Sequence, residues 1–174
     1  GAVEVYAAVM RSAARCTYTE VARMLDGERV PHREFLRDGF VRMGELQEIL
    51  GGVRRRRGSI DFDLPQSEVL LTEAGEIETI QASERNVAHR LIEEFMLAAN
   101  ETVASHVEQM EVPFIYRIHE EPAEEKVQDL ADFLATLGIS LPTAKKIKPL
   151  HLQKALAKAK GTPEEMLINT VLLR

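Results

Sequence analysis

Apolar side chains recur at helical spacing through residues 84–110, and this long run constrains the fold more than any other feature. Ser83 precedes the run as a candidate N-cap, and Pro113 lies just beyond its end. The pattern therefore predicts one long buried helix. Its apolar stripe consists of Ala88, Leu91, Ile92, Phe95, Ala99, Val103 and Met110.

Shorter segments with the same period predict further helices, which end at glycines or begin at caps. Alternating patterns predict a strand over residues 3–10, a short one at 60–63, a hairpin turning at Glu73-Ala74-Gly75, and a strand or extended segment over 114–118. These patterns predict an α+β fold that is mostly helical, with a small antiparallel hairpin, in a single domain over residues 1–174. The expected helices are 20–25, 33–50 (stopped by Gly51-Gly52), 123–137, 149–160 and 163–173 (capped by Thr162), and the hairpin strands are 68–71 and 76–80.

Length and composition set limits on function. A chain of 174 residues can bury one good hydrophobic core. Cys16 is the only cysteine, which excludes an internal disulfide or a cysteine-built zinc site and favours a reducing compartment, the cytoplasm. No apolar run approaches the ~20 residues of a membrane span, and the start at Gly1 is not typical of a signal peptide, so no membrane partner is expected.

Charge is unevenly distributed along the chain. The net charge of −6 argues against a nucleic-acid binder, but the basic residues gather in two clusters. One cluster is the run Arg54, Arg55, Arg56 and Arg57, and the other is a lysine-rich stretch from Lys145 to Lys160. Such clusters can neutralise phosphates, although a solvated helix face is the more ordinary interpretation.

The long helix carries polar side chains along one edge of its apolar stripe. His89 and Glu93 have the i, i+4 spacing of metal ligands, but no third or fourth ligand stands at a diagnostic spacing, so we expect no metal site. Capping or core roles are favoured for His89. Arg90 and Glu94 should form a solvated pair on the opposite side.

Two aromatic residues have functional and ordinary interpretations. Phe62 lies between Asp61 and Asp63, shortly after the arginine run, so it is either a base-stacking platform or a core residue. Tyr18 could offer its phenol to a ribose or a base edge, or simply pack with a solvated hydroxyl. Motifs for nucleotide hydrolysis, hydride transfer and serine hydrolysis are absent from the sequence.

Three blocks of sequence resemble the catalytic RNB domain of the ribonuclease II and ribonuclease R family, processive 3′ to 5′ exoribonucleases. The resemblance covers residues 6–138 in order and spacing, and it is closer to the ribonuclease R branch. The blocks are YAAVMRSAARCTYTEVARML at 6–25, RRRRGSIDFDLP with ERNVAHRLIEEFMLAAN within 54–100, and PFIYRIHEEPAEEKVQDLADFLATLG at 113–138.

The resemblance implies roles for three residues in binding single-stranded RNA. Phe62 matches the aromatic residue that stacks on the 3′-terminal nucleotides, whereas Tyr18 and Glu93 match the pair that recognises ribose. A phenol and a carboxylate can both bond a 2′-hydroxyl, the group that distinguishes RNA from DNA. His89, Arg90 and Asn100 also match and are assigned to helix packing and support.

The resemblance further implies that the whole enzyme hydrolyses RNA to 5′-nucleoside monophosphates with Mg²⁺. The family's magnesium-binding aspartates are expected before residue 1 and its transition-state arginine after Arg174, while Asp61 and Asp63 are not assigned to metal binding. We therefore expect an internal fragment of the catalytic domain, with no catalytic residue, no cofactor and no activity of its own.

Two other interpretations remain at this point. The chain could be a non-catalytic RNA-binding or protein-interaction module derived from the same fold. It could also be a plain helical scaffold, which predicts no salt-dependent RNA binding at all.

Overall fold

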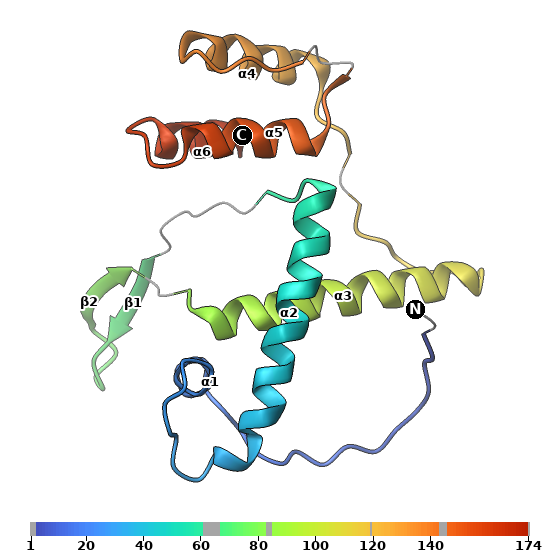
Figure 1. Cartoon of the computed structure of the whole chain (residues 1–174), viewed down its shortest axis with the longest axis vertical. Coiled ribbons are helices and arrows are strands. Elements are labelled where there is room, and N and C mark those ends of the chain that lie inside the picture. Colours follow the sequence, from blue (N-terminus) through green and yellow to red (C-terminus); the bar gives the residue numbers. More distant parts are fainter. Residues whose placement is uncertain (1–2, 61–66, 83–84, 119, 143–145, 174) are drawn as a thin grey trace. The chain divides into compact units, whose positions relative to one another are not determined.

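Helices dominate the computed structural model, which describes residues 3–60, 67–82, 85–118, 120–142 and 146–173 (Figure 1). Contacts divide the chain into two compact units, each formed by two segments of sequence. Unit 1 comprises residues 1–51 and 84–117, and unit 2 comprises residues 52–83 and 118–174. The prediction of one domain stays a prediction, because two compact units can belong to a single domain.

Unit 1 packs a short helix against the start of a long one. Its elements are α1 (Tyr18–Leu25), a 3-10 helix (Glu34–Leu36), most of α2 (Arg37–Arg57) and α3 (Val87–Gln109). A small core forms from Val21 and Met24 of α1, Val30, and Ala88 of α3. Cys16 is half-buried and packs against this core, as a small hydrophobic residue would.

The predicted strand over residues 3–10 is wrong. Residues 3–17 form no regular secondary structure, and Val3, Val5 and Val9 are exposed. Alternating side chains make a strand only where a neighbouring strand supplies hydrogen bonds. The described part of unit 1 contains no strand that could pair with this segment.

Helix α2 continues past the predicted stop at Gly51-Gly52 and ends at Arg57. Gly51 is buried, and the four arginines that follow favour helix. Gly58, with φ of 95°, ends the helix in a Schellman motif. Its N–H donates to the Arg55 carbonyl (3.0 Å), and the Ser59 N–H donates to the Arg54 carbonyl (3.2 Å).

The predicted long helix is confirmed as α3, but its predicted cap and its predicted burial are wrong. Asn86 caps it, accepting hydrogen bonds from the backbone of Ala88 and His89, while Ser83 lies outside the described residues. Apolar residues beyond its middle, including Met96, Val103 and Met110, are exposed, so α3 is not buried throughout. Glu94 is buried, at 6% exposure, so the predicted solvated pair with Arg90 is wrong.

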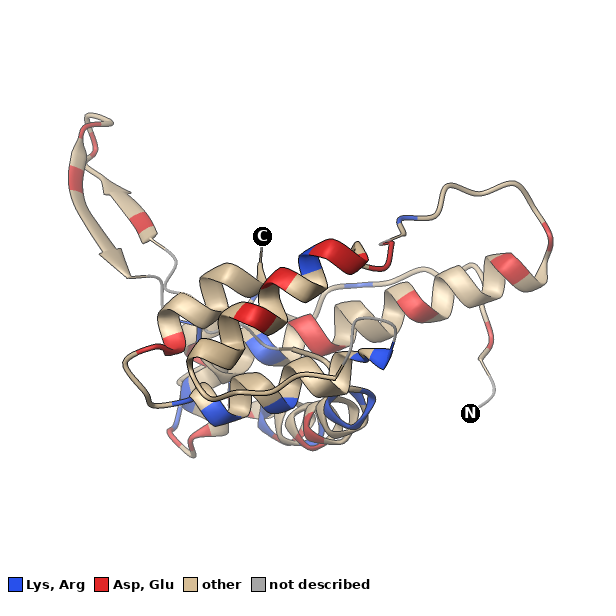
Figure 2. Cartoon of the chain, turned by 90° about the horizontal axis from the view of Figure 1, so that it is seen from above, with Lys and Arg blue, Asp and Glu red and all other residues tan. Residues whose placement is uncertain are grey.

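The described part of unit 2 contains the last turns of α2, a hairpin and three further α-helices. Strands β1 (Ser67–Leu71) and β2 (Ile77–Ala82) form the predicted antiparallel hairpin, in which Val69 lies opposite Ile80. Gly75 adopts φ of 81° in the turn, and its N–H donates to the Thr72 carbonyl (2.9 Å). Figure 2 shows acidic residues and no lysine or arginine on the hairpin.

The remaining helices match their predicted ranges closely. They are α4 (Glu124–Thr136), α5 (Pro149–Ala159) and α6 (Glu165–Leu172). The predicted Thr162 cap is wrong, because Glu164 occupies the cap position and the Thr162 hydroxyl donates to the Ala159 carbonyl (2.8 Å). The core of this unit consists of Leu134, Ile139, Ala155, Ala159 and Ile168.

Two further findings complete the fold. Residues 114–118 are without regular structure, so the strand alternative is wrong, and the rings of Phe114 and Tyr116 meet edge to face. Among the described helices, none combines the length and the apolar character that a membrane span requires.

Candidate functional site

Tyr18 occupies the first position of α1, and a capping box fixes the start of that helix. The Thr17 backbone N–H donates to the Glu20 carboxylate (2.8 Å), and the Glu20 N–H donates to Thr17 Oγ1 (3.2 Å). The hydrogen bond from the Thr17 backbone holds the pKa of Glu20 below its usual range. The box therefore fixes the direction in which the Tyr18 side chain leaves the helix.

The Tyr18 ring stacks on the imidazole of His89, with ring centroids 3.9 Å apart and planes 21° apart. Nδ1 of His89 lies 2.9 Å from Oδ1 of Asn86, the cap of α3. A carbonyl oxygen can only accept, so His89 Nδ1 carries the proton in this contact. Tyr18 stays 45% exposed, and the described residues supply no hydrogen-bond partner to its hydroxyl.

Glu93 lies one helical turn after His89, on the same side of α3. Arg85 holds the Glu93 carboxylate in a bidentate ion pair. Nε of Arg85 donates to Oε1 of Glu93 (3.0 Å), and Nη2 of Arg85 donates to Oε2. The Glu93 side chain remains 45% exposed. Arg85 uses two of the lone pairs of the Glu93 carboxylate, and the remaining lone pairs can accept a hydrogen bond from a further donor.

A cavity of about 480 Å³ opens beside Tyr18 within unit 1. Its wall is mainly apolar and comes from α1, α2 and α3, with Cys16 and Arg15 at its edge. The lining includes Val21, Phe40, Met43, Ala88, Leu91 and Ile92. The half-exposed Tyr18 phenol thus lines a hollow with apolar walls, an arrangement suited to a ligand with flat and polar parts.

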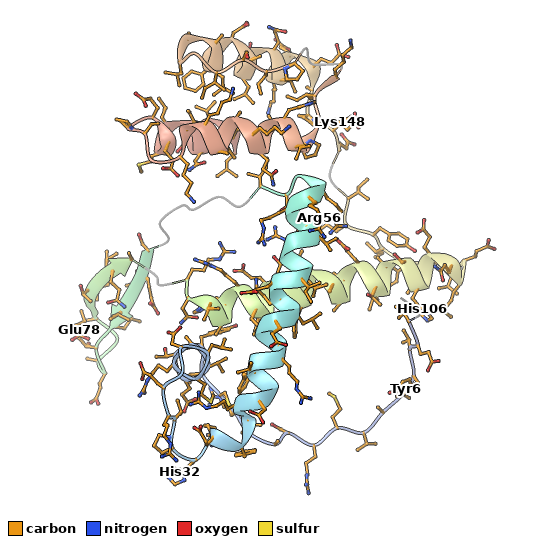
Figure 3. All side chains as sticks on the ribbon, in the orientation of Figure 1. Tyr6, His32, Arg56, Glu78, His106 and Lys148 are labelled. Carbon is orange, nitrogen blue, oxygen red and sulfur yellow. The ribbon has the colours of Figure 1, made fainter. Side chains whose placement is uncertain are left out.

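The other predicted site residues lie elsewhere. Phe62, with Asp61 and Asp63, falls outside the described residues. The four arginines form the last turn of α2 and belong to unit 2, where Arg55, Arg56 and Arg57 are exposed and Arg54 is half-buried. Figure 3 shows Arg56 at this end of α2.

Sequence reasoning missed Arg85 and Asn86. Arg85 is eight positions before Glu93 and precedes the helix, so helical spacing gives no signal for the ion pair. Asn is a preferred N-cap residue, and Asn86 directly precedes Val87, where α3 begins. Its residue type was therefore the signal that could have indicated the cap. Within the described ranges, no group of three or more His, Cys, Asp or Glu could hold a metal ion.

Comparison with known proteins places these features in a family. The sequence model of the RNB domain matches residues 2–174. Ribonuclease R of Aquifex aeolicus is 42% identical over 175 residues, covering 99% of this chain and 25% of the relative. Ribonuclease R 1 of Lactococcus lactis is 40% identical, covering 95% of this chain and 21% of the relative.

Solved structures agree on the fold. Mycoplasma genitalium RNase R in complex with double-stranded RNA has a TM-score of 0.82 and 23% identity, covering 90% of this chain and 28% of that one. The same enzyme with ribose-methylated single-stranded RNA has a TM-score of 0.81. The chain spans about a quarter of the length of these proteins. With the family model matched along almost its whole length, the chain belongs to the RNB domain family.

Proposed function

We propose that this chain is part of a 3′ to 5′ exoribonuclease that hydrolyses RNA to 5′-nucleoside monophosphates, and that it contributes contacts to the RNA. Membership of the RNB family and identity above 40% to a ribonuclease R support the activity. Solved RNase R complexes with single-stranded and double-stranded RNA support RNA as the partner. We propose the cytoplasm as the compartment in which the enzyme acts.

One observation carries the RNA-contact role: Tyr18 stacks on His89, one helical turn from Glu93. In our proposal the Tyr18 hydroxyl and the Glu93 carboxylate bond the ribose 2′-hydroxyl. Arg85 holds the carboxylate in place and leaves it able to accept one more hydrogen bond. Phe62 would stack on a base, and the exposed arginines at the end of α2 would contact phosphates.

Magnesium is the metal that we propose for the whole enzyme. The residues described here do not fit it, because they contain no cluster of three candidate ligands. In our proposal Tyr18, Glu93 and the arginines at the end of α2 bind and position RNA, and none of them acts as a catalytic residue.

The test uses the full-length protein that contains this chain. Glu93→Ala or Tyr18→Ala should lower the ratio of RNA to DNA cleavage rates by about tenfold, because a lost 2′-hydroxyl bond removes ~1 to 3 kcal/mol of discrimination. Met96→Ala, at an exposed position on the same helix, is the matched control. Unchanged rate ratios in both variants would show that these residues do not recognise ribose.

A further inference from the structure

The stack between Tyr18 and His89 joins the first residue of α1 to the first turn of α3 within unit 1. The two helices also meet in the core of this unit, where Val21 and Ala88 are buried. Tyr18 lies three positions before Val21, and His89 directly follows Ala88. The two rings therefore extend from backbones that a packed core holds in place.

Burial does not confine the Tyr18 ring, because 45% of the residue is exposed. Exposed side chains change rotamer within picoseconds to nanoseconds unless another contact restricts them. The His89 imidazole supplies such a contact, because it lies almost flat against one face of the phenol ring. Stacked aromatic rings prefer a defined relative geometry, so the stack restricts the tilt of the Tyr18 ring.

The imidazole is itself oriented by Asn86, the N-cap of α3. Oδ1 of Asn86 accepts from the Ala88 N–H (3.1 Å) and the His89 N–H (3.3 Å), and His89 Nδ1 lies 2.9 Å from the same atom. Two backbone donors identify that atom as the amide oxygen, so Nδ1 is the donor. This hydrogen bond sets both the tautomer and the plane of the imidazole. The residue that begins α3 thus also orients the ring on which Tyr18 stacks.

The orientation of Tyr18 matters because the ribose contact proposed above needs two groups at once. Arg85 already fixes the Glu93 carboxylate, one turn after His89 on α3. A hydrogen bond weakens steeply as its angle departs from linear, and a misplacement of about 1 Å in a binding group can cost up to 100-fold in rate. The Tyr18 hydroxyl therefore needs a comparable support.

We infer that His89 is a positioning residue for ribose recognition: it holds the Tyr18 phenol toward the 2′-hydroxyl, and Asn86 holds His89. The inference rests on the proposed function and adds the residues that determine its geometry. His89 itself bonds no RNA and acts through Tyr18. The competing explanation is that the imidazole only fills space between α1 and α3.

Two substitutions of His89 in the full-length protein separate these explanations. His89→Leu keeps the apolar bulk but removes the flat ring, whereas His89→Phe keeps a flat ring. Positioning predicts that His89→Leu lowers the ratio of RNA to DNA cleavage rates by about 3- to 10-fold, and that His89→Phe stays within about twofold. Space filling predicts equal ratios for both. His106→Leu, in the last turn of α3, is the matched control and should change nothing.

A substitution of Asn86 separates orientation of the ring from helix capping. Asn86→Ser retains a good N-cap, but the shorter side chain does not reach His89 Nδ1. The melting temperature should therefore stay nearly unchanged, while the rate ratio falls by about 3-fold. Asn86→Asp keeps an acceptor of the same length and should preserve the ratio. Because Asn86→Ser leaves the imidazole in place, it carries the test if His89→Leu does not fold.

The position of the Tyr18 ring can be measured without RNA. The probe is 3-fluorotyrosine in place of Tyr18 in the full-length protein, observed by fluorine NMR. Stacking should displace its resonance from that of free 3-fluorotyrosine. His89→Leu should move the resonance toward the free value, and His89→Phe should keep it displaced.

Three outcomes would overturn the inference. The first is a fluorine resonance that does not respond to His89→Leu, and the second is an equal rate ratio in His89→Leu and His89→Phe. The third is an unchanged ratio in Tyr18→Ala, which removes the ribose contact and with it the role of His89. A lowered ratio in Tyr18→Ala beside an unchanged one in His89→Leu overturns the inference alone, so its failure is distinct from that of the proposed function.

Discussion

The two halves of α3 carry similar apolar patterns and have opposite surroundings within unit 1. Residues 87–95 include Ala88, Leu91 and Glu94, all buried, and the Asn86 cap fixes their start. In residues 96–109, Met96, Leu97 and Val103 are exposed. An apolar stripe therefore indicates a helix, but burial depends on which elements lie against it. We call residues 87–95 the supported half of α3, because other elements of unit 1 pack against them. His89 and Glu93 both lie on this half, where rigid neighbours can hold a binding geometry.

The largest expected effect tests this contrast directly. Leu91→Ala, at 1% exposure, should reduce the free energy of unfolding by about 2 to 5 kcal/mol because it leaves a cavity. Val103→Ala, at 47% exposure on the other half, should change it by only about 0.5 kcal/mol. Urea denaturation followed by circular dichroism measures both. Equal losses would mean that both halves of α3 are buried alike in solution.

Helix positions could be predicted from the sequence because caps, glycines and apolar spacing are local properties. Helices α4 and α5 match within a residue or so of their predicted ranges. The predicted caps at Ser83 and Thr162 and the predicted stop at Gly51-Gly52 were local errors of a few residues. The other errors depend on distant parts of the chain. The strand over residues 3–10 needs a partner strand, and Glu94 is buried although its spacing placed it toward solvent.

The candidate site was only partly predictable from the sequence. The sequence resemblance indicated Tyr18 and Glu93, and the structure shows their neighbours: His89 beneath the Tyr18 ring, and Arg85 on the Glu93 carboxylate. These contacts join α1 to α3, or the segment before α3 to the helix. Spacing along one helix contains no information about either contact.

A second prediction concerns the cap that begins the supported half. Asn86→Ala removes the acceptor for the Ala88 and His89 backbone N–H groups and for His89 Nδ1. The free energy of unfolding should fall by about 0.5 to 2 kcal/mol. Gln109→Ala, at the exposed far end of α3, should have almost no effect in the same denaturation experiment. A loss of similar size at both ends would remove the distinction between the halves.

A third prediction separates stability from recognition on the supported half. Arg85→Gln breaks the exposed bidentate pair with Glu93 and should cost at most about 1 kcal/mol of stability. In the full-length enzyme, it should still lower the ratio of RNA to DNA cleavage rates, by about 3-fold, because the Glu93 carboxylate loses its fixed orientation. Arg90→Gln, an exposed arginine on the same helix, is the control. If Arg85→Gln lowers stability alone, the pair does not position Glu93.

The smallest effect is expected at Glu20, whose capping box holds the start of α1, and with it Tyr18, against the supported half of α3. The hydrogen bond from the Thr17 backbone lowers the folded-state pKa of Glu20 below the value of 4.5 for a free side chain. A lowered pKa stabilises the fold above pH 4.5, and this stabilisation is lost as the pH falls through the folded-state value. Glu20→Gln preserves the capping pattern without the charge, so it should be less stable than the natural chain at pH 7, and the difference should shrink at pH 3. Urea denaturation at both pH values measures this difference, and Glu45→Gln, an exposed glutamate on α2, serves as the control. A Glu20→Gln difference that persists unchanged at pH 3 would mean that the carboxylate charge does not stabilise the start of α1.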